Sequence, residues 1–139
     1  MAIKQISILL ENKQGKLADI TRALADAGIN LRAMSIAETQ EYGMLRLIVS
    51  DPQKVKDTLQ DGTVVVETEV VAVKMSDDKG GLADVLKVFD KANVNIDYAY
   101  AFTGHADGLA YVVFRVDDNL AAEAMLKEAG FKLITQADL

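Results

Sequence analysis

The sequence predicts an α+β fold made of two tandem units, each with the order strand, helix, strand, strand, helix, strand. The stretch Asn12–Asp19 (NKQGKLAD) returns 65 residues later as Asp77–Asp84 (DDKGGLAD). Three further pairs keep this interval without a gap, namely Ala27 and Ala92, Asn30 and Asn95, and Gly43 and Gly108. A register held over so many positions indicates that one unit was duplicated.

The first unit opens with a strand at Ile3 to Leu10, which ends in a polar turn around Gly15. A helix follows, because apolar residues recur at the three- and four-residue steps of one buried stripe. Gly28 is well placed to end this helix. The residues of the stripe are Leu17, Ile20, Leu24 and Ala27.

The middle of the unit is expected to form a hairpin, with strands at Leu31 to Glu38 and Met44 to Ser50 joined by a turn over Thr39 to Gly43. Asp51 can cap a second helix, and Pro52 fits its first turn, where a missing donor costs nothing. Val55 and Leu59 are the inward residues of that helix, and Thr63 to Val66 form the strand after it.

The second unit repeats this order. Its expected elements are strands at Val70 to Met75, Ile96 to Thr103, Leu109 to Val116 and around Phe131 to Thr135, with helices at Gly81 to Ala92 (bearing Leu82, Val85, Leu86 and Phe89) and from Asp117 or Asp118 to about Ala129. Because no flexible linker is visible, the last strand of residues 1–67 is expected to run into the first strand of residues 68–139, with a bend near Glu67, Thr68 and Glu69.

Composition bounds the class of protein. Half of the 139 residues are hydrophobic and about a quarter are charged, which is typical of a soluble globular protein. A net charge of −6 disfavours nucleic acid as a partner. The absence of cysteine excludes disulfides and thiolate chemistry and favours a cytoplasmic location. No apolar run is long enough to predict a membrane span, and no targeting segment is visible.

A sheet with both helices on one face leaves its other face open. Such a face needs a partner, and units of about 65 residues bury only about 60% of their unfolded surface alone. We therefore expect the two sheets to associate and a homodimer to bury what remains.

The turn Gly-x-Leu-Ala, followed by Gly-Ile-Asn-Leu at residues 28–31 and Asn-Val-Asn-Ile at residues 93–96, resembles the ACT domain, a ferredoxin-like regulatory module that binds amino acids. The resemblance covers nearly the whole chain, twice. Family members commonly carry a proline before the turn glycine, where this sequence has Gln14 and Lys79. The proline bears on the rigidity and the ligand geometry of the turn, while the fold does not depend on it.

The chemical groups at this turn are suited to bind an amino acid. Free backbone amides at a helix start attract a carboxylate, glycine allows close approach, and Asn or Asp oxygens can accept from an ammonium group. The resemblance implies pockets in which the turn of one unit faces the second strand of its neighbour. The ligand-binding candidates are Asn12, Gln14, Gly15, Lys16, Leu17, Asn30 and Leu31 in the first unit, and Asp77, Lys79, Gly80, Gly81, Leu82, Asn95 and Ile96 in the second.

Two further features have alternative interpretations. Tyr98, Tyr100 and Phe102 alternate along one strand, with Tyr111 and Phe114 on the next, and they form either an interface between units or an aromatic pocket wall. His105, the only histidine, lies in a hairpin turn without the partners that catalysis or metal binding requires.

The sequence therefore favours a non-enzymatic amino-acid sensor that modulates a partner enzyme of amino-acid metabolism, without cofactor or metal. The alternative is a permanent structural or regulatory subunit that uses its sheets for assembly alone. A small enzyme is disfavoured because chemistry-bearing motifs are missing. An RNA-binding protein is disfavoured because its paired aromatic and basic residues are missing. Branched aliphatic or aromatic amino acids are the favoured ligands.

Overall fold

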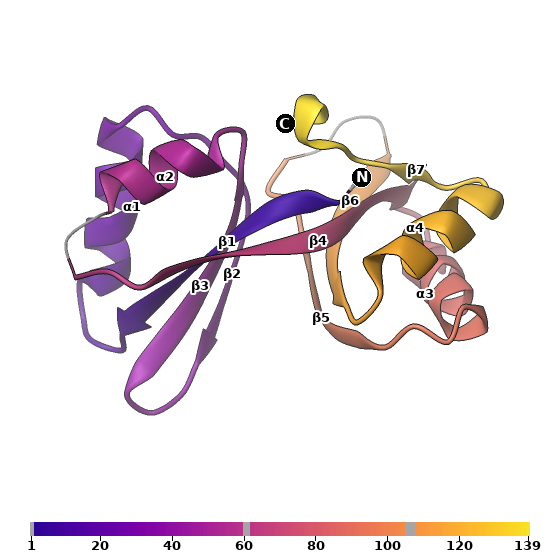
Figure 1. The fold of residues 1–139 in the computed structure, drawn as a ribbon, viewed down its shortest axis with the longest axis horizontal. Helices are drawn as coiled ribbons and strands as arrows, with labels where there is room; N and C mark the ends of the chain where they lie inside the picture. The colour runs from indigo at the N-terminus through magenta and orange to yellow at the C-terminus, as the bar shows by residue number, and fades with distance from the viewer. Residues whose placement is uncertain (1, 60–61, 105–107) are drawn as a thin grey trace. The chain divides into compact units, whose positions relative to one another are not determined.

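The structure is a computed structural model that describes residues 2–59, 62–104 and 108–139. The chain divides into two compact units, Lys4–Thr68 and Glu69–Leu139 together with Met1–Ile3. Each unit has the predicted strand-helix-strand-strand-helix-strand order, as Figure 1 shows. The α+β class is confirmed. The turn that holds His105 lies outside the described residues.

The unit Lys4–Thr68 has a four-stranded sheet in the order β2-β3-β1-β4 (Figure 1). β3 pairs antiparallel with both β1 and β2. Its elements are β1 (Ile3–Glu11), α1 (Lys16–Asp26), β2 (Leu31–Glu38), β3 (Tyr42–Val49), α2 (Pro52–Thr58) and the first residues of β4 (Val65–Ser76).

The unit Glu69–Leu139 has the matching order β7-β4-β6-β5, with antiparallel pairs throughout. Its elements are the rest of β4, α3 (Gly81–Lys91), β5 (Ile96–Ala101), β6 (Leu109–Val116), α4 (Asn119–Glu128), β7 (Lys132–Leu133) and a short 3-10 turn (Gln136–Asp138). β4 continues as one strand through Glu67, Thr68 and Glu69, so the prediction that one unit's last strand runs into the next unit's first strand is confirmed.

Strand pairing corrects the predicted register of the repeat. Leu10 pairs with Gly43 in the first unit, and its counterpart Met75 pairs with Ala110 in the second. The interval between equivalent residues is therefore 65 in the first strand and 67 in the third. The match of Gly43 with Gly108 is wrong, because the second hairpin is two residues longer.

The caps of the second helices agree with the longer interval. Asp51 accepts from the Lys54 amide at 3.2 Å. Asp118 accepts from the Ala121 amide at 3.0 Å. Of the two predicted candidates, Asp117 and Asp118, it is Asp118 that caps the second helix of its unit. The two caps, Asp51 and Asp118, lie 67 residues apart. Each provides an acceptor for an otherwise unpaired helix amide.

The core of the unit Lys4–Thr68 lies between one sheet face and both helices. Because side chains alternate along a strand, Ile6, Ile8 and Leu10 point together toward the helices. They pack there with the fully buried Leu24 of α1 and Val55 of α2. Leu17, Ile20 and Ala27 pack against this cluster, which confirms the predicted stripe.

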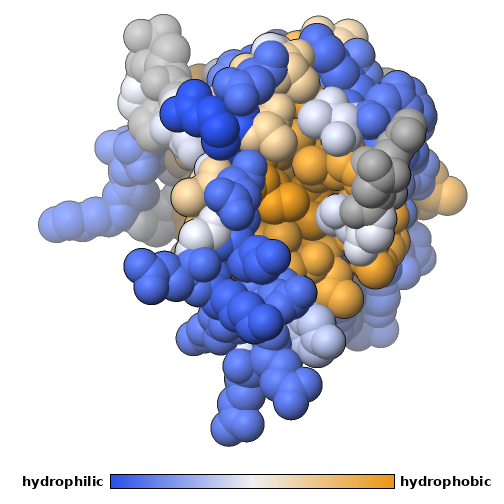
Figure 2. All heavy atoms as spheres, turned by 90° about the vertical axis from the view of Figure 1, so that its left-hand side faces the viewer, coloured by the Kyte–Doolittle hydropathy of each residue, from blue (hydrophilic) through white to orange (hydrophobic). Residues whose placement is uncertain are grey.

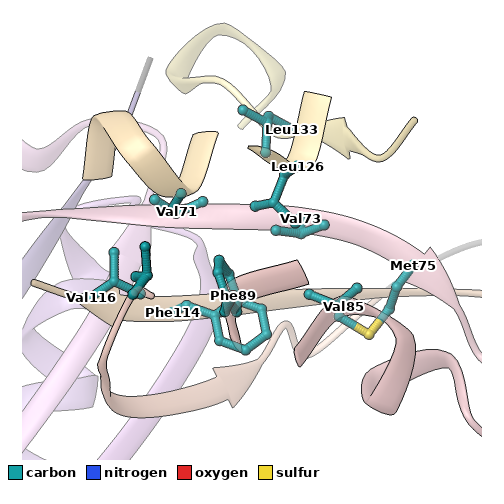
Figure 3. Packing of buried hydrophobic residues seen from close by; sticks show 11 residues of the cluster. Val71, Val73, Met75, Val85, Phe89, Phe114, Val116, Leu126 and Leu133 are labelled. Carbon is teal, nitrogen blue, oxygen red and sulfur yellow. The ribbon is translucent and has the colours of Figure 1, made fainter. Parts of the chain in front are cut away.

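The second core repeats this arrangement with different side chains (Figure 3). Phe89 of α3 and Phe114 of β6 meet edge to face with their ring centroids 4.9 Å apart. Of the apolar residues predicted on this helix, Val85 and Phe89 are buried, whereas Leu82 and Leu86 are exposed. Leu82, near the start of α3, is 48% exposed.

The predicted aromatic row is confirmed on the other face of β5. Tyr98 and Tyr100 pair with Arg115 and Val113, and their rings stack with centroids 6.4 Å apart. The Phe102 amide donates to the Tyr111 carbonyl at 2.9 Å, and the two rings meet edge to face. Phe114 belongs to the opposite, helix-covered face. Three residues separate it from Tyr111, and an odd separation reverses the face of a strand.

Candidate functional site

The two glycine turns have the same geometry. Gly15 and Gly80 have φ angles of 89° and 86°, a left-handed conformation that glycine adopts without steric cost. Each glycine precedes its helix directly and accepts from the amide of the residue four positions later, Asp19 at 2.9 Å and Asp84 at 3.0 Å. The strand-to-helix turn predicted from the repeat is therefore formed in both units.

The second turn is packed more tightly than the first. A Cβ placed on Gly81 would lie 2.1 Å from the Ser76 carbonyl oxygen. The Ser76 hydroxyl donates to the Asp78 carboxylate at 3.1 Å and accepts from the Asp78 amide at 3.1 Å. Lys16 occupies the position of Gly81 in the first turn, so the first turn must leave more room there.

A pocket of about 320 Å³ lies beside the second turn, entirely within the unit Glu69–Leu139. Its wall is mainly apolar, and Asp77 and Asp78 are the acidic residues among the described residues that line it. The lining residues are Met75, Ser76, Asp77, Asp78, Leu82, Ala99, Tyr100, Ala101, Ala110 and Val112. We call this hollow the Gly80 pocket.

Small side chains on β5 explain the hollow. Ala99 and Ala101 occupy the positions that Met34 and Ile36 have in β2 of the first unit, at the 65-residue interval. Ile36 lies over Gly43 there, with its Cδ1 atom 3.5 Å from where a Cβ on that glycine would be. The larger side chains thus fill in the first unit the space that two alanines leave open in the second.

The first turn is tied to its own hairpin. The Asn12 amide donates to the Glu41 carbonyl at 2.9 Å, and the Asn12 side chain donates to the Thr39 carbonyl at 3.3 Å. Lys13 contacts Glu11 at 2.9 Å. This lysine lowers the pKa of Glu11 through a hydrogen bond and its charge, with a smaller contribution from the charge of Lys16.

Asn30 and Asn95 lie at the end of each sheet that is opposite to the glycine turn. Asp77 adjoins the start of β6, where its amide donates to the Gly108 carbonyl at 3.0 Å. Asn95 adjoins the end of β6, where its amide donates to the Asp117 carboxylate at 3.0 Å. Leu31 likewise pairs with Val49 at the far end of β3. One unit alone therefore cannot bring its turn and its asparagine to the same ligand.

The structure brings only part of the predicted site together. Asp77 and Leu82 line the Gly80 pocket, and Lys16 lines a separate pocket of the first unit. Leu17, Leu31 and Ile96 pack against the cores. Neither pocket is lined by Asn12, Gln14, Gly15, Asn30, Lys79, Gly80, Gly81 or Asn95. Asp78, Ala99 and Ala101 also line the Gly80 pocket, but the sequence analysis does not include them among the candidates. The signal for the two alanines is that they align with the larger Met34 and Ile36 in the first repeat.

The charged groups do not form a metal site in the described ranges. Within residues 2–59, 62–104 and 108–139, no group of three or more His, Cys, Asp or Glu side chains could hold an ion. In the same ranges, none of the helices has the length and apolar character to cross a membrane.

Two α+β units with the same order of strands and helices, each with a left-handed glycine turn, define a tandem duplication of one small module. The family description "ACT domain pair" matches residues 1–139. The chain therefore belongs to the ACT domain family, as the resemblance of its turns predicts. No curated protein matches the sequence.

Solved structures agree with this assignment. Protein BT0572 from Bacteroides thetaiotaomicron is 39% identical, with a TM-score of 0.91 over 99% of this chain and 95% of that one. The ligand-free regulatory subunit of aspartate kinase from Thermus thermophilus is 14% identical, with a TM-score of 0.68 over 94% of both chains. The corresponding subunit from Thermus flavus is 14% identical, with a TM-score of 0.62 over 93% and 94%. At that identity the two subunits show the fold alone.

Proposed function

We propose that this protein is a non-enzymatic regulatory protein that binds an amino acid and modulates a partner enzyme of amino-acid metabolism. The observation that carries the proposal is the Gly80 pocket, which combines carboxylates, a helix start and an apolar wall within one small volume. Its volume of about 320 Å³ is at the lower end of the range for small-molecule sites.

Each part of an amino acid has a counterpart in this pocket. The first amides of α3 lack partners within the helix and carry the positive end of its dipole, which favours a carboxylate. Asp77 and Asp78 can accept hydrogen bonds from an ammonium group. Leu82, Ala101 and Val112 offer an apolar surface to the side chain. Without Met34 and Ile36 equivalents, this surface has room for a branched aliphatic group.

The proposal keeps two predictions from the sequence. A second copy of the unit would supply the asparagine that a single unit holds at the wrong end of its sheet, so that the amino acid binds where units meet. A homodimer would bury the remaining apolar surface. Ligand binding regulates a partner only if it favours one arrangement of the units over another.

The family and the structural neighbours support the regulatory role. An ACT domain pair is the description that covers this chain. Two of the neighbours are regulatory subunits of aspartate kinase, so an enzyme that acts on amino acids is the kind of partner to expect.

Thermal unfolding in the presence of each of the twenty amino acids tests the proposal. A ligand at a hundred times its Kd stabilises the folded state by about 2.7 kcal/mol, which shifts the midpoint by several degrees. We expect a small group of apolar amino acids to do so. A flat response to all twenty would instead favour the subunit that serves assembly alone.

A double variant locates the site. Ala99→Met with Ala101→Ile introduces the side chains that β2 carries at the equivalent positions of the first unit. We expect the double variant to unfold like the wild type and to lose the ligand-induced shift. An unchanged shift would remove the Gly80 pocket from the proposal.

A further inference from the structure

A second hollow lies in the other unit, between α1 and the segment that leads into β4. Figure 2 looks onto the unit Lys4–Thr68 and shows hydrophobic surface gathered between hydrophilic side chains. A pocket of about 570 Å³ lies in this unit. Its apolar part comes from Leu9, Leu10, Ile20, Ala23 and Val64, and its polar part from Glu11, Lys16, Asp19, Tyr42 and Thr63. We call it the Thr63 pocket.

One residue explains why the first unit has this pocket. Val65 and Leu133 pack into the two cores from the last strand of each unit. Two positions before them are Thr63 and Phe131. Phe131 packs against the core of its unit, whereas Thr63 lines the pocket. A short polar side chain therefore leaves open in the first unit the space that an aromatic ring covers in the second.

The two hollows are thus complementary. The second unit is open where β5 carries alanines and closed at Phe131. The first unit is closed by Met34 and Ile36 and open at Thr63. For each pocket, the larger side chains that would close it are present at the equivalent positions of the other unit. Duplication followed by such exchange gives two sites of different size and different position.

The polar rim has both signs of charge. Lys16 and Asp19 are three residues apart on α1, a spacing that puts two side chains on the same side of a helix. Both are exposed, and neither forms an ion pair with any residue of the described ranges. Glu11, the third charged lining residue, is already paired with Lys13. The rim therefore offers one cation to an anion and one carboxylate to a cation.

We propose that the Thr63 pocket is a second ligand site, which takes an amino acid with a large apolar side chain. Lys16 binds the carboxylate of the ligand, Asp19 binds its ammonium group, and Leu10, Ile20 and Ala23 contact its side chain. The larger volume, about 570 Å³ against about 320 Å³, suits an aromatic or long aliphatic group. This site extends the proposed function, but it does not require the Gly80 pocket to be occupied.

The test uses L-phenylalanine and L-leucine as probes, titrated into the full chain by calorimetry and followed by amide chemical shifts. We expect shifts at Ala23 and Val64 that saturate with one of these probes. Thr63→Phe, which copies the residue of the second unit, should weaken this binding at least about tenfold, or about 1.4 kcal/mol. Thr63→Val, which keeps the side-chain volume, should bind like the wild type.

The Ala99→Met and Ala101→Ile double variant separates this inference from the proposed function. It should leave the shifts at Ala23 and Val64 unchanged and abolish only those at Ala110 and Val112. Loss of both sets in the double variant would overturn the second site as an independent one.

Two further measurements test the charges without altering the core. Lys16→Gln and Asp19→Asn should each weaken binding of L-phenylalanine. N-acetyl-L-phenylalanine, which lacks the ammonium group, should bind more weakly than the free amino acid. Equal binding of the two probes, no shift at Ala23 with either amino acid, or full binding by Thr63→Phe would overturn the assignment.

Discussion

The close approach of Gly81 to the Ser76 carbonyl gives a prediction that stability measurements can test directly. Gly81 is the buried first residue of α3, and a Cβ there would lie 2.1 Å from that oxygen. Real Cβ atoms essentially never lie within 3.0 Å of such an atom, so Gly81→Ala forces the backbone to move by roughly 1 Å. We expect this overpacking to lower the free energy of unfolding by about 1–3 kcal/mol.

Helix propensity acts in the opposite direction. Alanine is favoured over glycine in a helix interior by about 1 kcal/mol, and it also restricts the unfolded chain. A stabilised Gly81→Ala protein is therefore the result expected if the close contact did not matter. The sign of the change distinguishes the two effects.

Urea unfolding followed by circular dichroism measures this change. In a unit of about 70 residues, 1 kcal/mol also corresponds to about 4–8 °C in the midpoint of thermal unfolding. Lys16→Ala is the matched control, because Lys16 holds the equivalent position in the first turn and already has a Cβ. We expect this control to change stability by no more than about 0.5 kcal/mol. Gly81→Ala as stable as the wild type would refute the reasoning.

Three further predictions concern the cap, an ion pair and the core. Asp118→Ala removes the acceptor of the Ala121 amide and should cost about 1 kcal/mol in urea unfolding, while Asp118→Asn should cost little. The pKa of Glu67 is lowered, mainly by its hydrogen bond from Lys56, so its contribution is present above the ordinary carboxyl pKa of 4.5. That contribution is lost as the pH falls through the lowered pKa, and Glu67→Gln should reduce the loss of stability on acidification. Phe89→Ala opens a cavity in the second core and should cost about 3–5 kcal/mol.

Each of these has a result that would contradict it. An Asp118→Ala protein as stable as the wild type would mean that the cap contributes nothing. An acid unfolding profile unchanged by Glu67→Gln would show that other carboxylates control it. A cost near 1 kcal/mol for Phe89→Ala would mean that the surrounding side chains collapse into the space.

Periodicity and capping chemistry predicted the local structure well. The stripe from Leu17 to Ala27 formed the expected helix, and Asp51 formed the expected cap, because both signals depend on residues a few positions apart. The hairpin insertion was missed, since two extra turn residues change no periodicity. Gly43 and Gly108 look equivalent in the sequence because each follows a hairpin turn. Leu10 pairs with Gly43, but its counterpart Met75 pairs with Ala110, so Gly108 is not the equivalent of Gly43.

The candidate site depended on contacts that no local pattern encodes. Leu82 follows the helical period, but it is 48% exposed and lines a pocket. The opposite sheet ends occupied by Asp77 and Asn95 follow from the antiparallel pairing of β4, β5 and β6. A list of motif residues contains no such information about distance.

The duplicated α+β fold, the glycine turns and the family can be inferred from order and spacing along the chain alone. The places of the two pockets depend on the folded structure. An empty space exists when residues far apart in sequence fail to fill it together, as the alanines of β5 do beside the Gly80 turn, and as Thr63 does beside α1.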